Sequence, residues 1–405
     1  AEIVYAVPGH PLVGEATVPA LLRAAREAGV PVRLVHGLSF VEPTLAALEI
    51  DILDGLQVLD ALDVVASLFP KVNVDRPVLL GQVYNQLVAS ELKLTLMALY
   101  PDDQPAILVH GAGLPDERVE RLALYEIDRS PHLGHLTSLF LPARPGVNDL
   151  TGLAETAAIL RSPEGCPWDQ EQTALSLRPG ILEEACEVME AIEQEDTEGM
   201  VEELGDLIFQ VVMQAQIAAE DGAFNISDVI RGIDSKLKFR HPHVWGDLAV
   251  SGTSEVLVNW EALKEQEKAA KGLGDRPVSL LDNIPGALPS LTRAQKMQKR
   301  SAKVGFDWPA LAGVYAKIGE ELAELQAADG QPETQHEVGD LLFSVVNLAR
   351  WYGVDAEIAL RDANNRYQQR FQLVERLARD QNQEMQTLSI EALEALWQEA
   401  KRRLQ

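Results

Sequence analysis

Cysteine is scarce in this sequence: Cys166 and Cys186 are the two examples in 405 residues. So low a count excludes a disulfide-stabilised scaffold and is typical of a protein from a reducing cytoplasm. Aromatic residues are also few, at 5%, but hydrophobic residues reach 46%, which is enough to build several globular cores. No run of about 18 apolar residues occurs, and no signal peptide is evident, so we expect a cytoplasmic protein without a membrane span.

Basic residues are outnumbered, with 35 Lys and Arg against 62 Asp and Glu, for a net charge of −27. This balance argues against binding to a nucleic acid polymer, which needs clustered basic side chains. The charge is uneven: residues 151–275 carry 9 basic and 25 acidic groups, net −16, whereas residues 276–405 carry 16 and 18, net −2. Clustered carboxylates form either a solvated face or a divalent metal site, and their spacing has to decide between the two.

The first third of the chain has the pattern of an α/β domain. Short apolar runs typical of strands alternate with helical patterns, which predicts a largely parallel sheet. The predicted strands are Ile3–Val7, Val32–Val35, Val78–Val83 and Ala106–Val109, and the predicted helices include Val18–Ala28 and Ser90–Tyr100. A segment rich in proline and glycine, Leu141–Asn148, is expected to be a linker.

From Leu150 onward the apolar residues follow a helical period, so we expect residues 150–405 to be all-α. One apolar stripe contains Ile181, Leu182, Ala185, Val188, Met189 and Ile192. A second contains Val201, Leu204, Leu207, Ile208, Val211, Val212 and Ala215. The Gly- and Pro-rich stretch Lys271–Pro289 is predicted to be a second linker. The expected domains are therefore 1–145, 150–272 and 276–405.

An internal repeat relates the two halves of the helical region. Five motifs recur in the same order, which indicates two copies of one helical module. They are Gly165-Cys-Pro-Trp168 and Gly305-Phe-Asp-Trp308; Glu183-Glu184-x-x-Glu187 and Glu320-Glu321-x-x-Glu324; Glu203-Leu-Gly-Asp206 and Glu337-Val-Gly-Asp340; Lys236-x-x-x-Arg240 and Arg366-x-x-x-Arg370; and Trp260-x-x-x-Lys264 and Trp397-x-x-x-Lys401.

The repeated carboxylates are the candidate catalytic and metal-binding residues. At about 100° per residue, two carboxylates three positions apart share one side of a helix, and a helical hairpin can bring two such pairs together. Close like charges need a counter-cation, and oxygen ligands suit Mg²⁺ or Mn²⁺. A solvated acidic face would have no reason to keep the same spacing twice. The eight residues are Glu184, Glu187, Glu203, Asp206, Glu321, Glu324, Glu337 and Asp340.

Glycines and cations accompany both carboxylate sets. Gly205 and Gly339 each lie inside a predicted helix, where glycine costs about 1 kcal/mol relative to alanine; we expect a close approach there by a ligand or by another helix. Two cations one helical turn apart are suited to binding phosphate, although they are also compatible with a surface pair. Each tryptophan is suited either to stacking on a base or to packing in a core. The candidate substrate-binding residues are Lys236, Arg240, Trp260, Lys264, Arg366, Arg370, Trp397 and Lys401.

At these residues the chain resembles the MazG family of all-α nucleoside triphosphate pyrophosphohydrolases. The resemblance covers residues 150–405 and is carried by both E-E-x-x-E and E-x-x-D pairs, and by Arg240-His-Pro-His-Val244 and Val304-Gly-Phe-Asp-Trp308. It implies Mg²⁺-dependent hydrolysis of an NTP or dNTP to the monophosphate and pyrophosphate. It also implies that the protein forms a homodimer. The binding partners that it implies are nucleoside triphosphates.

The first third resembles a tetrapyrrole methylase domain, through Val4-Tyr-Ala-Val-Pro-Gly-His-Pro-Leu-Val13 and Ser90-Glu-Leu-Lys-Leu-Thr-Leu-Met97. That family binds S-adenosylmethionine. Here nothing precedes Ala1 where the family has a first strand and a Gly-rich loop, Gly9-His10-Pro11 replaces the usual Gly-Asp-Pro, and Gly37-Leu-Ser39 departs from Pro-Gly-x-Ser. We therefore expect an N-terminally incomplete domain that does not bind this cofactor normally.

Two other functions are compatible with the sequence: a regulatory protein with degenerate MazG modules, and a methyltransferase with MazG as an accessory. Two complete carboxylate sets argue against the first, and the missing opening loop argues against the second. Of the two modules, the second is expected to be the stronger hydrolase. It carries less negative charge, it has arginines at 366 and 370, and it follows a basic stretch from Arg293 to Lys303.

Overall fold

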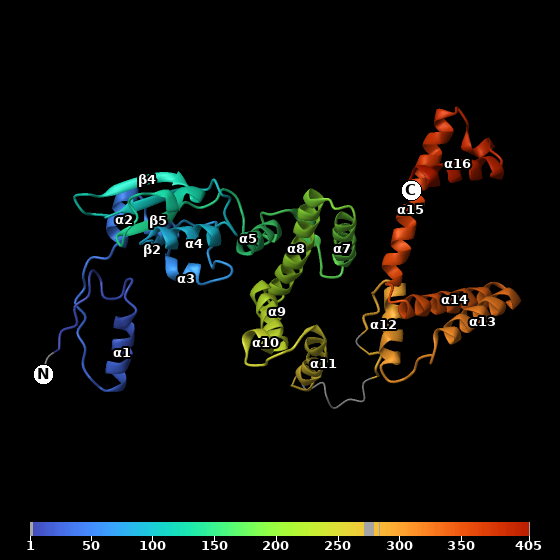
Figure 1. The fold of residues 1–405 in the computed structure, drawn as a ribbon, viewed down its shortest axis with the longest axis horizontal. Helices are drawn as coiled ribbons and strands as arrows, with labels where there is room; N and C mark the ends of the chain where they lie inside the picture. The colour runs from blue at the N-terminus through green and yellow to red at the C-terminus, as the bar shows by residue number, and fades with distance from the viewer. Residues whose placement is uncertain (1–2, 271–278, 283, 405) are drawn as a thin grey trace. The chain divides into compact units, whose positions relative to one another are not determined.

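The structure, a computed structural model, describes residues 3–270, 279–282 and 284–404. The chain forms two compact units, Ala1–Ser251 and Gly252–Gln405, and Figure 1 traces it from the α/β part in blue and cyan into the helices in green to red. Across the described ranges, no helix combines the length and the apolar character needed to cross a membrane. The predicted linker at 271–289 lies largely outside the described residues.

The N-terminal part is an α/β domain, as the sequence predicts, and it contains one five-stranded sheet of order β1-β2-β5-β3-β4. Its elements are α1 (Thr17–Glu27), α2 (Val41–Leu48), η1 (Ile52–Asp54), β1 (Gln57–Asp60), α3 (Ala61–Val65), β2 (Val78–Gly81), α4 (Gln86–Leu96), β3 (Pro105–His110), β4 (Arg118–Ala123), η2 (Leu124–Arg129) and β5 (Thr137–Leu141).

Both faces of this sheet are buried. Because side chains alternate along a strand, Leu79 of β2 lies on one face in a cluster with Leu48 of α2, and Leu80 lies on the other face in a cluster with Leu92 of α4. Figure 1 shows α2 and α4 at the sheet. The sheet is therefore the middle layer of a domain with a core on each side.

The predicted parallel sheet is wrong in detail. Only the β1–β2 pair is parallel among the four described pairs, and the β2–β5, β3–β4 and β3–β5 pairs are antiparallel. The connection between β3 and β4 spans residues 111–117, which is shorter than the dozen or so residues that a parallel crossover needs. Apolar content alone does not distinguish parallel from antiparallel strands, whereas the length of this connection does.

Two predicted strands, Ile3–Val7 and Val32–Val35, are not strands in the structure. Their apolar side chains are exposed, among them Ile3, Val4 and Val35. A strand needs a neighbour that accepts and donates its ladder hydrogen bonds, and neither segment pairs with another described one. The predictions for the other elements are closer: α1 matches Val18–Ala28, β2 matches Val78–Val83 and β3 matches Ala106–Val109.

The rest of the described chain is helical, so the term all-α fits this region and not the N-terminal domain. The helices of the first unit are α5 (Leu150–Arg161), α6 (Pro167–Glu171), α7 (Arg178–Glu193), α8 (Thr197–Glu220), α9 (Ile226–Arg240) and α10 (Pro242–Trp245). Those of the second are α11 (Thr253–Ala270), α12 (Ser290–Ala302), α13 (Leu311–Ala327), α14 (Gln331–Trp351), α15 (Ala356–Asp380), η3 (Met385–Thr387) and α16 (Ile390–Arg403).

Two helical hairpins carry the repeated carboxylates, α7–α8 and α13–α14 (Figure 1). Asp196 caps α8 by accepting a hydrogen bond from the Gly199 amide at 3.0 Å, which fixes the turn in the first hairpin. In the second, Gly330 adopts a φ of 94° just before α14, a conformation that glycine adopts without strain. A further helix packs on each hairpin: α5 on α8, and α12 on α14.

The apolar stripe of α8 is only partly buried. Val212 and Ala215 are in the core, but Val201, Leu204 and Ile208 remain exposed. On α14 the same holds for Val338, Leu342, Phe343 and Val345. Each hairpin therefore presents an uncovered apolar face beside its carboxylates.

Candidate active site

The first hairpin gathers three of its four predicted carboxylates. Ligand oxygens of Glu184 and Glu187 on α7 and Glu203 on α8 lie within 4.8 Å of one another. Burial, followed by the charges of Asp206 and Glu187, raises the pKa of Glu184. Burial and the neighbouring charges of Glu202, Asp206 and Glu184 likewise raise the pKa of Glu203. Asp206 thus lies close enough to act on both residues electrostatically.

The second hairpin gathers Glu321 of α13 with Glu337 and Asp340 of α14, again with ligand oxygens within 4.8 Å. Glu321 is almost completely buried, with 4% of its surface exposed. Glu324 lies beside this group, and burial and the charge of Glu321 raise its pKa. The repeated spacing in the sequence therefore corresponds to two carboxylate clusters of similar composition.

A lysine distinguishes the second cluster. Lys317 Nζ lies 2.6 Å from Glu320 Oε1 and 2.7 Å from Glu321 Oε1, and these contacts raise the pKa of Lys317. It precedes Glu321 by one helical turn, so the two side chains share a face of α13. The pair leaves the buried Glu321 carboxylate neutralised by a cation that is about one-third exposed.

Both carboxylate groups fit a hard divalent cation. The donors are all carboxylate oxygens, which is the ligand set of Mg²⁺ and Mn²⁺. They come from two packed helices, so their separation is fixed by the hairpin. Burial, followed by the charges of neighbouring carboxylates, raises the pKa of Glu184 and Glu203, and a bound cation would relieve the repulsion between these charges.

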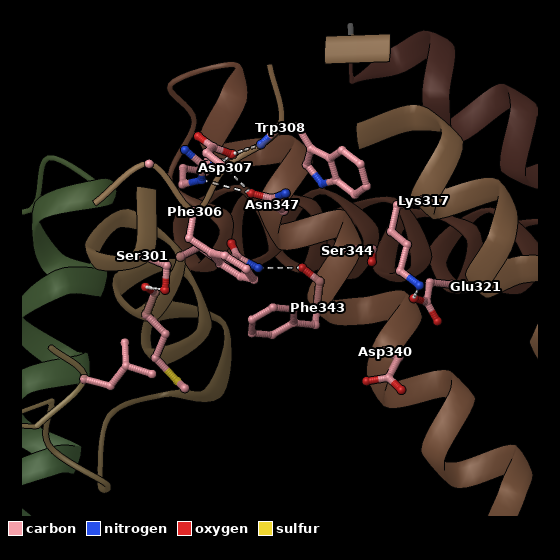
Figure 2. Close-up of a pocket in the computed structure, with 15 residues that line it drawn as sticks. Ser301, Phe306, Asp307, Trp308, Lys317, Glu321, Asp340, Phe343, Ser344 and Asn347 are labelled. Atoms are coloured by element: carbon pink, nitrogen blue, oxygen red, sulfur yellow. Dashed lines mark hydrogen bonds and ion pairs between the residues drawn. The ribbon is translucent and has the colours of Figure 1, made fainter. Parts of the chain in front are cut away.

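A cavity of about 700 Å³ adjoins the second cluster (Figure 2). Lys317, Glu321 and Asp340 lie at one side, and Asp307, Trp308 and Asn347 lie at another. Phe306, Phe343, Met297, Ser301 and Ser344 also line it. The volume and the mixture of aromatic and polar walls are those of a small-molecule site.

One buried atom of this cavity lacks a partner. Gln298 is 8% exposed, and its Nε2 donates to the Phe343 carbonyl at 2.8 Å. Its Oε1 has no hydrogen-bond partner among the described residues. Buried polar atoms are nearly always paired, so this oxygen is an exception: it is inaccessible to solvent, and no described residue donates to it.

The first hairpin has the same arrangement of two helices and carboxylates as the second, but different side chains lie beside the carboxylates. Aligning Glu203 with Glu337 pairs Gln210 with Ser344 and Met213 with Asn347. Met213 is fully buried in an apolar cluster with Ala157 of α5 and Leu177. An apolar core thus occupies the region that is a polar-lined cavity in the second hairpin.

Gln210 occupies further space in the first hairpin. A Cβ on Gly180 would lie 2.8 Å from Gln210 Nε2, and aligning Glu184 with Glu321 pairs Gly180 with Lys317. The glutamine amide therefore fills space beside the carboxylates and bonds to Glu184. In the second copy, Ser344 is too short to do either.

At Gly205 and Gly339 the described chain shows no close approach by another of its own helices, and the predicted approach by a ligand or by a helix of a second chain stays a prediction. A Cβ at either position would meet no atom within 4 Å in the described structure. Both glycines lie on open helix surface within the uncovered face of their hairpin. Their helix-weakening cost therefore has no explanation within this chain.

The predicted phosphate-binding cations lie on other helices: Lys236 and Arg240 on α9, Lys264 on α11, Arg366 and Arg370 on α15, and Lys401 on α16. None of them lines the described cavity. Trp397 packs at 5.2 Å from the Tyr367 ring and contacts the α15–α16 core. Trp260 lies on α11, so the structure does not bring the predicted substrate-binding set together within one described cavity.

Among the polar residues of the cavity that sequence reasoning missed are Lys317, Asp307, Asn347 and Arg350. Lys317 has a local signal, because it precedes the Glu320-Glu321 pair by one turn. Asp307 stands inside the motif Gly305-Phe-Asp-Trp308, but its partner Arg350 is distant in the sequence. That pairing becomes visible only when α14 packs beside the 305–308 turn.

Comparison with known proteins agrees with these features. Residues 172–245 match the MazG nucleotide pyrophosphohydrolase domain, and residues 1–128 match the tetrapyrrole (corrin/porphyrin) methylases. The chain is 40% identical to the uncharacterized protein YabN of Bacillus subtilis over 99% of this chain and 82% of that protein.

Relatives with named activities match the helical region. A nucleoside triphosphate pyrophosphohydrolase of Escherichia coli K12 is 46% identical, over 63% of this chain and 98% of its own length. One from Thermotoga maritima is 46% identical over 60% of this chain and 91% of its own length. The chain belongs to the MazG family of nucleoside triphosphate pyrophosphohydrolases and carries a tetrapyrrole methylase domain in front of the MazG region.

Proposed function

We propose that this protein hydrolyses nucleoside triphosphates, NTP or dNTP, to the monophosphate and pyrophosphate at the α13–α14 hairpin. The observation that carries the proposal is the cavity of about 700 Å³ that joins a carboxylate cluster to an aromatic and polar compartment. The carboxylate cluster suits the triphosphate chain of a substrate, and the aromatic and polar compartment suits its nucleoside. The described residues of the first hairpin provide the cluster with a filled core beside it.

The roles follow from position. Glu321, Glu337 and Asp340 would hold Mg²⁺. When bound, this ion neutralises phosphate charge and lowers the pKa of a water molecule. A carboxylate of the same cluster accepts the proton of the attacking water, and Lys317, which lines the cavity, offers positive charge to the phosphates.

We infer that residues 276–405 form a second MazG module. The family model covers 172–245, in the first copy, but the second copy repeats the hairpin, the carboxylate group and the packing helix. In this proposal the first module is the weaker hydrolase, because Gln210 and Met213 fill the space that the substrate needs.

We also infer a homodimer. Exposed Val201, Leu204 and Ile208 on α8, and Leu342 and Val345 on α14, form apolar faces beside the carboxylates. Burying a large aliphatic side chain contributes roughly 1.5–3 kcal/mol. A second copy of the chain would cover these faces and enclose the clusters.

The test is product analysis. Purified protein incubated with each of the common NTPs and dNTPs should release pyrophosphate and the monophosphate in Mg²⁺, and neither in excess EDTA. Asp206→Asn combined with Asp340→Asn should abolish release while circular dichroism keeps its helical signal. Release of inorganic phosphate and a diphosphate, or full turnover in EDTA, would contradict the proposal.

A further inference from the structure

The group of residues at the end of the cavity far from the carboxylates includes a turn, residues 305–308, that precedes α13. Phe306, Asp307 and Trp308 of this turn line the cavity (Figure 2). The turn begins at Gly305, whose φ of 83° is a conformation that glycine adopts without strain. The turn therefore supplies one acidic and two aromatic side chains to the cavity wall.

Asp307 fastens this turn to α14. Its Oδ1 lies 2.5 Å from a terminal nitrogen of Arg350 and accepts a hydrogen bond from the Trp308 amide at 2.9 Å. The aspartate and arginine side chains are 23% and 13% exposed. The hydrogen bond from Arg350 holds the pKa of Asp307 below its usual value, so the pair is charged at neutral pH. A partly buried ion pair thus ties the turn to the helix that carries Asp340.

The indole of Trp308 lies against α13. A Cβ added at Gly313 of α13 would lie 2.7 Å from Cε3 of the indole and 3.1 Å from its Cδ2. The backbone of α13 therefore approaches the six-membered ring more closely than a residue with a side chain would permit. Two consecutive residues thus hold the turn to both helices of the hairpin, Asp307 to α14 and Trp308 to α13.

The surroundings of Trp308 differ from those of a core tryptophan. Trp308 is 43% exposed and lines the cavity, whereas Trp397 packs on the α15–α16 core. Trp260 and Trp397, the two tryptophans predicted to bind substrate, do not line the described cavity. An exposed indole leaves apolar surface in water, and a nucleotide base stacked on it would cover that surface.

The position of the indole suits a substrate whose phosphates lie at the carboxylates. Gly313 precedes Glu321 by eight positions on α13, so the two are separated by roughly 12 Å along the helix axis. This separation leaves room for a sugar and phosphates between a base at Trp308 and an ion at Glu321. The same cavity is lined by Trp308 at one side and by Asp340 at another (Figure 2).

We propose that Trp308 stacks on the base of the bound nucleotide. Asp307 and Arg350 are positioning residues, which hold the turn that carries the indole at a set distance from the carboxylates. Gly313 is the third positioning residue, because its lack of a side chain makes room for the ring. The proposal rests on the proposed function and adds to it the residue that binds the nucleoside.

The ion pair is present in the second module alone. By the repeat alignment, Asp307 corresponds to Pro167 and Arg350 to Gln216. The first hairpin forms without such a pair, so the pair is not needed to build a hairpin. The tryptophan itself is kept as Trp168, but there it belongs to the short helix α6 and is 64% exposed. The pair therefore accompanies the cavity rather than the carboxylate motif.

The first experiment changes the indole in the full chain. Trp308→Leu should raise KM for one purine and one pyrimidine nucleoside triphosphate by roughly tenfold, because stacking on an aromatic ring is lost. Its kcat should change little, since the indole does not touch the reacting phosphates. Trp308→Phe keeps an aromatic face and should restore most of the affinity.

Product inhibition separates loss of stacking from general damage to the site. In Trp308→Leu the inhibition constant of the nucleoside monophosphate should rise by roughly tenfold. The inhibition constant of pyrophosphate should stay at the wild-type value, because pyrophosphate has no base. A fold that is merely weakened would raise both constants together.

Gly313→Ala tests the seat of the ring without removing it. The added Cβ must push the indole away, whereas alanine favours a helix more than glycine does, so the variant should fold. KM and the monophosphate inhibition constant should lie between those of wild type and Trp308→Leu. Gly319→Ala, on the same helix, is the matched control: a Cβ there meets no atom within 4 Å, and both constants should stay unchanged.

Asp307→Asn tests the ion pair. It removes the charge that attracts Arg350 while keeping the shape of the side chain, so the turn should be held less firmly. The same two constants should rise, and that of pyrophosphate should not. Asp329→Asn changes an exposed aspartate at the α13–α14 turn outside the cavity and should raise none of the three.

Unchanged KM and monophosphate inhibition in folded Trp308→Leu would overturn the inference. Equal rises for monophosphate and pyrophosphate would overturn it as well, because the indole would then act on the fold and not on the base. Failure of the wild type to release pyrophosphate from any nucleoside triphosphate would instead overturn the proposed function.

Discussion

Lys317→Met tests the cation balance of the second cluster. Lys317 is the cation that the described chain places against the buried Glu321 carboxylate, at 2.7 Å. Methionine keeps an apolar stem of similar length but no charge, so the change removes the ion pair with little loss of packing. Without a metal, the variant leaves Glu321 as a buried charge without a partner.

The magnitude follows from the burial of the two partners. Removing one partner of a buried ion pair costs about 3–5 kcal/mol. Because Lys317 is 34% exposed, water screens part of this, and about 2 kcal/mol is expected. For a unit of this size, that corresponds to a fall in Tm of about 4–8 °C. Contact with Glu320 and Glu321 raises the lysine pKa, so the contribution is complete at neutral pH and is lost only in strong alkali.

Excess Mg²⁺ should shrink this loss, because a cation held by Glu321, Glu337 and Asp340 replaces the missing charge. The assay is scanning calorimetry at neutral pH, in EDTA and in Mg²⁺. Lys296→Met, at an exposed lysine of α12 outside the cavity, is the control and should change Tm little in either buffer. An equal fall in Tm in both buffers would refute metal binding by this cluster.

Three further predictions concern the copies and the assembly. Glu337→Gln should remove most pyrophosphate release and Glu203→Gln little; the reverse result would assign catalysis to the first module. Ser344→Gln should raise KM for all nucleotides by roughly fivefold or more, because overpacking costs about 1–3 kcal/mol; an unchanged KM would show that this wall is not used. Light scattering at micromolar concentration should give the mass of a dimer, and a strict monomer would contradict the role of the exposed faces.

The carboxylate clusters could be predicted from sequence because their information is local and repeated. Glu337 and Asp340 are three positions apart on one helix, and Glu321 belongs to the helix before it. A hairpin is the simplest way to connect two adjacent helices. Helical period therefore predicted both the elements and the shared side of the carboxylates, and the structure places Glu321, Glu337 and Asp340 together.

The cavity could not be predicted in the same way. Its far group depends on Asp307 meeting Arg350 across 43 positions, and periodicity contains no signal for such a contact. The prediction of the sheet was partly wrong for a related reason. Val32–Val35 has the composition of a strand, but a strand exists only where a neighbour supplies hydrogen bonds. Contacts between distant segments decide both features.

The two modules share the carboxylate motif but differ in the space beside it. The family model matches the first module, at 172–245, yet the described cavity lies in the second. The matched range contains the α7–α8 hairpin and its carboxylates. Substrate binding needs in addition an empty volume beside them, which depends on short or polar residues at positions such as Ser344 and Asn347. Gln210 and Met213 occupy the corresponding positions in the first module while its carboxylates are unchanged, so we expect identity at the carboxylates to be a poor guide to which copy hydrolyses nucleotides.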